Sequence, residues 1–257
     1  MVMYIEIVGR VPKGFVDTIK CAVEELYSRT RQGHELLEIY IYESTEMKLR
    51  KLLREALELG VTLIGDYPVA HEAWMGWPRI HLDYEKCKAL SQATLRALMI
   101  HECAHSVLHG NIAGYVVFLE KKLAKKLGEN AAELIYVAST AIKDLEVHEY
   151  LVAHGFDEEV KAYYEYVARD LREAECMNGV EILTLVKLVT PCIVIECKPA
   201  PDDLVGEKCK RHYGNVTRAL LYVKSLNCDL SCKVNALLEQ LELTGQQAIS
   251  GTYSSIH

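Results

Sequence analysis

Hydrophobic positions alternate in two early segments of the chain and recur at helical spacing between and after them. Residues 4–8 and 36–42 alternate and are rich in β-branched or aromatic side chains, which predicts two strands. Residues 15–29 and 45–59 carry apolar side chains at intervals of three and four, which predicts two amphipathic helices. Residues 61–86 return to an extended pattern broken by glycines and prolines. The first part of the chain is therefore expected to combine strands with helices.

From Ser91 onward the pattern is helical. Ser91 is a plausible N-cap and Gly110 a plausible C-cap for one long helix. Further helices are predicted over residues 115–126, 130–153, 158–176, 180–189, 215–226 and 230–243. The apolar run 180–197 predicts a buried helix followed by a strand, and the polar residues 244–257 predict a frayed end. Strands and helices first, then helices alone, indicate the α+β class.

Composition narrows the classes of function. The chain has 257 residues, with 29 Lys and Arg against 36 Asp and Glu, so its formal charge is −7. A surplus of negative charge argues against nucleic acid as the main partner. Residues 180–197 are interrupted by charges and a proline, so we expect no membrane span. The first ten residues lack the features of a signal peptide, which predicts a cytoplasmic protein.

Nine cysteines are unusual for that compartment. Three lie scattered in the first half, and the last third holds the other six, at positions 176, 192, 197, 209, 228 and 232. Buried free thiols, disulfides of the kind found in hyperthermophile cytosols, and a second metal site all fit these spacings. No connectivity follows from the sequence.

The long helix carries His101-Glu102-x-x-His105, an H-E-x-x-H zinc signature. Side chains four residues apart project from the same face of a helix, so the two imidazoles can converge on one metal ion. Glu102 lies beside them and is placed to accept a proton from a metal-bound water as general base. Burying two histidines and a glutamate in an apolar helix without hydrogen-bond or metal partners would destabilise the fold by roughly several kcal/mol. The sequence therefore predicts a Zn²⁺ site rather than a hydrogen-bonded histidine pair.

Two neighbours of the motif are expected to lie outside the site. Cys103 points about 200° round the helix from His101 and is expected in the core. His109 is expected as a solvated histidine near the C-terminal end of the helix dipole.

A catalytic zinc needs three protein ligands and an open position. Leu108 stands where the metzincin extension has glycine, so the third ligand is expected from a later helix. Residues 130–153 are the best source, with Asp144 preferred because it shares its side with the small Ala141. Glu146, His148 and Glu149 stay open as alternatives.

With these residues the first part of the chain resembles a minimal zincin metallopeptidase of the gluzincin type. The resemblance implies a zincin-like domain over residues 1–155, followed by a helical, cysteine-rich extension over 156–257. Gluzincins take their third ligand from a second helix, often in an E-x-x-x-D pattern, whereas here Asp144 is followed four residues later by His148. The resemblance also implies a substrate-binding edge strand, for which Glu72–Pro78 is the candidate. His148, Tyr150 and Tyr136 are candidates for stabilising the oxyanion.

Two functions are weighed. The first is a zinc-dependent metallopeptidase that hydrolyses peptide bonds of a peptide or protein substrate, with His101, His105 and Asp144 on the metal. The second is a zincin-fold binding or regulatory protein whose metal site is structural or inactive. The sequence gives neither the substrate nor the oligomeric state, and it allows the last third to act as a lid, inhibitor or dimerisation surface. The lysine run 121–126 is expected to form a solvated helix face.

Overall fold

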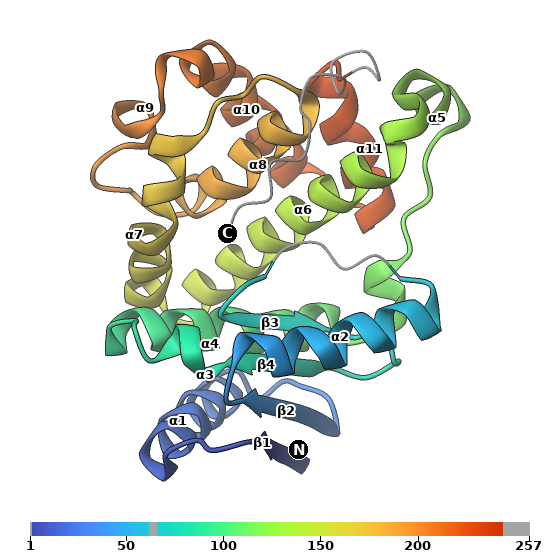
Figure 1. Cartoon of the computed structure of the whole chain (residues 1–257). Helices are drawn as coiled ribbons and strands as arrows, with labels where there is room; N and C mark the ends of the chain where they lie inside the picture. Colours follow the sequence, from blue (N-terminus) through green and yellow to red (C-terminus); the bar gives the residue numbers. More distant parts are fainter. Residues whose placement is uncertain (1, 62–65, 244–257) are drawn as a thin grey trace. The chain divides into compact units, whose positions relative to one another are not determined.

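A computed structural model describes residues 2–61 and 66–243. The chain divides into two compact units, Met1–Tyr115 and Val116–His257. The boundary expected after residue 155 falls inside the second unit, between two of its helices. The protein is of mixed α and β structure: strands occur in the described part of the first unit, and the described part of the second unit is helical (Figure 1).

Unit 1 holds a four-stranded mixed sheet in the order β1-β2-β4-β3. Its elements are β1 (Val2–Val8), α1 (Lys13–Thr30), β2 (Leu36–Tyr42), α2 (Thr45–Leu59), β3 (Val69–Glu72), β4 (Arg79–Asp83), α3 (Tyr84–Cys87) and α4 (Gln92–His109). Strands β1, β2 and β4 run parallel, and β3 pairs antiparallel with β4. Among the described residues, β1 and β3 are thus the two edges of this sheet.

The central strand β2 fits its place because most of its side chains, on both faces, are apolar or aromatic. Leu37, Ile39 and Ile41 are fully buried on one face, and Tyr40 and Tyr42 are buried on the other. Helix α4 covers the first face and contacts α1, whereas α2 covers the second face (Figure 1). The expected strands and helices of the first 60 residues are confirmed.

A buried polar cluster joins α2 to the sheet on this second face. The Arg79 guanidinium bonds to both Glu72 and Glu55, with 2.7 Å between Arg79 Nη2 and Glu55 Oε2. The ring of His81 bonds through Nδ1 to the hydroxyl of Tyr42 at 3.0 Å and through Nε2 to Glu72 at 3.1 Å. Burial lowers the pKa of His81, against the opposite effect of Glu72.

Unit 2 is built from helices alone among its described residues. These are α5 (Lys121–Leu127), α6 (Ala131–Ala153), α7 (Asp157–Glu173), α8 (Gly179–Val189), α9 (Pro201–Leu204), α10 (Glu207–Ser225) and α11 (Leu230–Gln240). Helix α6 contacts α7, α8 and α11, and α10 contacts α8 and α11, so that α6 and α8 carry much of the core. The lysines of α5 are exposed, as expected.

Two predicted elements of unit 2 are wrong. The helix expected over 115–126 begins only at Lys121, because α11 side chains take the backbone groups of the preceding segment: Ser231 Oγ accepts from Phe118 N–H, and Asn235 bonds Phe118 O and Glu120 N–H. The strand expected after α8 is a 3₁₀ turn, Thr190–Ile193, with Pro191 at its start. The frayed end expected at 244–257 lies outside the described residues.

Six of the nine cysteines form disulfides, all in unit 2. The pairs are Cys176–Cys209, Cys192–Cys197 and Cys228–Cys232. The thiols of Cys21, Cys87 and Cys103 in unit 1 are free. Of the three alternatives left open by the sequence, disulfides hold for the last third and free thiols for the first half. Because disulfides are rare in most cytosols, the cytoplasmic location stays a prediction. No described helix is both long enough and apolar enough to cross a membrane.

Candidate metal centre

The H-E-x-x-H motif lies in the middle of α4, in unit 1. Ser91 caps this helix by accepting a hydrogen bond from Thr94 N–H at 3.0 Å, and the helix ends at Gly110, as predicted. Its apolar residues bury it against α1 and β3, so that His101 is only 2% exposed and His105 8%. Neither imidazole of the motif is turned to solvent.

The two imidazoles converge. His101 Nε2 and His105 Nε2 lie 3.0 Å apart, with the ring planes at 76°. Two nitrogens at about 2.0–2.1 Å from a tetrahedral zinc ion lie roughly 3.3 Å apart, so this spacing is close to that of a shared metal. Ligation of a metal ion by this pair stays a prediction.

Glu102 is held beside this pair by the edge strand. Its Oε2 accepts a hydrogen bond from the backbone N–H of His71 at 2.9 Å. Asp83 N–H donates a hydrogen bond to Pro68 O. In an antiparallel pair every second residue bonds to the neighbouring strand, so the backbone N–H and C=O of His71, three residues after Pro68, point away from β4. This hydrogen bond ties the Glu102 carboxylate to the edge strand.

Two further side chains of unit 1 lie near the motif and were not predicted. The His71 ring stacks nearly parallel to that of His105, with centroids 5.9 Å apart. Tyr115 Oη lies 3.4 Å from His71 Nδ1. The only signal in the sequence was a histidine within an extended segment just before the motif helix. Its position near His105 depends on the pairing of β3 with β4, which the sequence did not define.

The two neighbours of the motif have different outcomes. Cys103 is fully buried, as predicted, and burial raises the pKa of its thiol. The expectation for His109 is wrong: this side chain is 8% exposed, and its ring centroid lies 5.6 Å from that of His105. Tyr115 ends a 3₁₀ turn, Ile112–Tyr115, that folds back onto the end of α4, so the last turn of α4 is not solvated.

The candidate third ligands all lie on α6, in unit 2, where their surroundings separate them. Glu146 Oε1 pairs with Lys233 Nζ at 2.5 Å, and Glu149 Oε1 with Lys224 Nζ at 3.4 Å. These two carboxylates thus tie α6 to α11 and α10. Asp144 is 3% exposed and His148 fully buried, one turn apart.

Asp144 lies in a mixed environment. Its Oδ2 is 3.6 Å from Lys187 Nζ on α8. The neighbouring Lys143 is buried, and the loss of solvation lowers the pKa of its ammonium group to about 8, although Asp144 raises it. A buried carboxylate needs positive charge near it, and one partly buried lysine at this distance supplies part of it.

Among the described residues, His101, His105 and Asp144 form a buried group that could hold a metal ion. This is the set predicted from the sequence. The identity of the metal stays a prediction, as does the role of each residue.

The remaining predicted residues have structural contacts of their own. The His148 ring contacts that of Tyr163 edge-on at 5.0 Å, and the Tyr150 ring lies 4.2 Å from that of His154. Tyr136 is partly buried on α6. A role of His148, Tyr150 or Tyr136 in oxyanion stabilisation stays a prediction.

The candidate substrate edge is displaced by a few residues. Within Glu72–Pro78 only Glu72 belongs to β3, and residues 73–78 form the turn to β4. The edge strand itself is Val69–Glu72. The shift arises because Gly76 adopts a positive φ of 97°, which turns the chain where an extended segment was expected.

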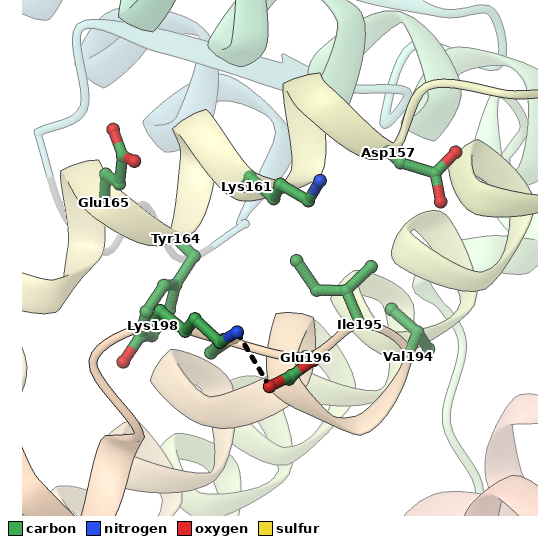
Figure 2. A pocket seen from close by; sticks show the side chains of 9 residues that line it. Asp157, Lys161, Tyr164, Glu165, Val194, Ile195, Glu196 and Lys198 are labelled. Atoms are coloured by element: carbon green, nitrogen blue, oxygen red, sulfur yellow. Dashed lines mark ion pairs between the residues drawn. The ribbon is translucent and has the colours of Figure 1, made fainter.

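An open pocket of about 490 Å³ occurs elsewhere, in unit 2 (Figure 2). It lies between α7 and residues 194–198 and is lined by Asp157, Lys161, Tyr164, Glu165, Val194, Ile195, Glu196, Cys197 and Lys198. Both of its lysines pair locally: Lys198 Nζ lies 3.1 Å from Glu196 Oε1 (Figure 2), and Lys161 bonds to Glu158. None of the predicted site residues lines it, so we do not assign it to the metal centre.

Comparison with known proteins gives no assignment. No protein-family model matches the chain, and no curated protein or solved structure is similar enough to count as a match.

Proposed function

We propose that the protein is a zinc-dependent metallopeptidase of the zincin type, with a minimal zincin-like arrangement in its first part. The observation that carries the proposal is the convergence of His101 Nε2 and His105 Nε2 on one helix face, with Glu102 fixed beside them. The buried group of His101, His105 and Asp144 supports three protein ligands for the ion. A bound Zn²⁺ supplies a Lewis acid and lowers the pKa of a coordinated water to about 7.

The residues of the chain would divide the remaining work. His101, His105 and Asp144 hold the ion. Glu102 accepts the proton from the attacking water and passes it to the leaving amine, and the His71 amide holds its carboxylate beside the two imidazoles. Strand β3 is an edge strand among the described residues, and the backbone groups of Val69 and the carbonyl of His71 face away from β4, where an extended peptide would pair by β-augmentation. The substrate would then be a peptide or protein segment without regular structure.

A Glu102→Gln variant tests the role of the base. Glutamine keeps the size and the bond from His71 N–H but cannot accept a proton. We expect one zinc ion per chain to be retained and the hydrolysis of an unbiased peptide library to fall by roughly 10²–10⁴-fold. The measurements are elemental analysis of the purified protein and mass spectrometry of the library.

A His105→Ala variant tests the ligands, with His212→Ala on α10 as the matched control. We expect His105→Ala to lose its zinc and His212→Ala to keep it. Equal zinc in His105→Ala and the wild type would refute the assigned site. Zinc bound through these ligands without any hydrolysis by the wild type would favour the alternative of a binding or regulatory protein.

A further inference from the structure

Strand β1 is an edge of the sheet among the described residues, and several of its apolar side chains are exposed. Beyond β2, no other strand in the described part of the chain pairs with β1. Val2, Tyr4 and Ile7 are 66%, 49% and 46% exposed. Proteins usually protect such an edge with lysine, proline, a bulge or a very short strand. Strand β1 has seven residues, and Glu6 is its single charge.

The hydrogen bonds to β2 show which backbone groups of β1 are unused by the sheet. Val2 N–H donates to Glu35 O, and Val8 O accepts from Glu43 N–H. In a parallel ladder alternate residues bond to the neighbouring strand, so the even-numbered residues of β1 face β2. The amides and carbonyls of Met3, Ile5 and Ile7 therefore point away from the sheet.

We propose that this edge pairs antiparallel with β1 of a second copy of the chain, about a twofold axis through Ile5. In this register Ile5 lies opposite Ile5 of the second copy, and Met3 lies opposite Ile7 of the second copy. The backbone N–H and C=O groups that point away from each sheet can then bond to one another at each of these pairs. The result would be one continuous eight-stranded sheet. Self-pairing of a single strand is the isologous contact that a twofold dimer requires.

Charge selects this register among the neighbouring ones. With the axis at Ile5, Glu6 lies opposite Tyr4 of the second copy, where the phenol can donate to the carboxylate. With the axis at Glu6, the two carboxylates would face each other, which is unfavourable. With the axis at Tyr4, no residue of β1 in the second copy would lie opposite Ile7. The Ile5 register is therefore the one that uses all three open residues without opposing charges.

Substitutions at Tyr4 test both the edge and the register. Tyr4 is half exposed, so a polar side chain there is compatible with the fold of the monomer. Tyr4→Glu sets a carboxylate opposite Glu6 in two symmetry-related pairs and is expected to weaken dimerisation by roughly tenfold. Tyr4→Lys, the matched control, sets an ammonium group opposite Glu6 and is expected to retain the dimer. The double variant Tyr4→Glu with Glu6→Lys is expected to restore it.

Sedimentation equilibrium of the full chain, from low micromolar to about 100 μM, measures the dissociation constants. Hydrogen exchange locates the contact: the amides of Met3, Ile5 and Ile7 are expected to be protected in the dimer and to exchange fast in Tyr4→Glu. A wild type that stays monomeric throughout this range overturns the proposal. A dimer that Tyr4→Glu leaves intact, with these amides unprotected, overturns it as well, as does loss of the dimer in Tyr4→Lys.

Discussion

The two units are stabilised by different means. Unit 1 buries charged and polar side chains in bonded clusters, among them Arg79 with Glu72 and Glu55, and keeps its three thiols free. The helices of unit 2 bury mainly apolar side chains, and three disulfides cross-link their connections. Polar clusters fix one geometry only while every partner is present, whereas a cross-link acts mostly on the unfolded chain. Unit 1 is thus suited to hold reactive groups in place, and unit 2 to resist unfolding.

The largest expected effect is at the polar cluster of unit 1. Arg79→Leu leaves the carboxylates of Glu72 and Glu55 without their cation, and we expect it to lower the free energy of unfolding by about 3–5 kcal/mol. Arg54→Leu is the matched control, because the Arg54–Glu58 pair is exposed and contributes at most ~1 kcal/mol. Urea unfolding measures both. A small effect of Arg79→Leu would show that unit 1 does not depend on this cluster.

Removing the disulfide between Cys176 and Cys209 is expected to lower the free energy of unfolding by a somewhat smaller amount, and only in unit 2. It closes a loop of 33 residues, so replacing both cysteines by serine should cost about 3.7 kcal/mol from chain entropy. The same replacement at Cys192 and Cys197, five residues apart, should cost only about 2 kcal/mol.

Hydrogen exchange on peptides from α8 and α10, compared with peptides from β2 and β4, separates the two units. Faster exchange in the strands of unit 1 after removal of the Cys176–Cys209 disulfide would contradict the comparison. A reducing agent should reproduce the effect on the wild type.

The smallest expected effect is a dependence on pH that belongs to unit 1. Burial lowers the pKa of His81 below its ordinary value of 6.5. Above that pH the ring is neutral in both states and stability is unaffected. As the pH falls below about 6.5, the unfolded chain binds a proton that the folded chain does not, so stability declines by up to ~1.4 kcal/mol per pH unit until the folded pKa is reached.

A His81→Gln variant provides the control for this dependence, because glutamine does not titrate. Between pH 6.5 and 5 the stability of the variant should fall less steeply than that of the wild type. The lowered pKa values of Asp66 and Glu25 act only in more acidic solution, since their ordinary values are 3.8 and 4.5. An unchanged slope in the variant would assign the effect to another group.

A feature of the fold or of the candidate site could be predicted from the sequence where the residues that determine it are close together in the chain. The helix with His101, Glu102 and His105 follows from periodicity and from the caps at Ser91 and Gly110, all within 20 residues of sequence. The failure at residues 115–126 has a distant cause, because Ser231 and Asn235 lie more than 100 residues away. The same holds for the candidate third ligands: Glu146 lies 2.5 Å from Lys233 on α11 and Asp144 lies 3.6 Å from Lys187 on α8, and neither distance follows from the sequence of α6.

The bond between His71 N–H and Glu102 makes the geometry of the candidate site depend on the alignment of two strands. A slip of β3 against β4 by one residue would send the His71 amide and ring to the opposite sides, and the carboxylate would lose its anchor. The turn at residues 73–78, which sets that alignment, contains no proposed ligand. An insertion of one residue in this turn should therefore be as damaging as a change in the motif helix itself.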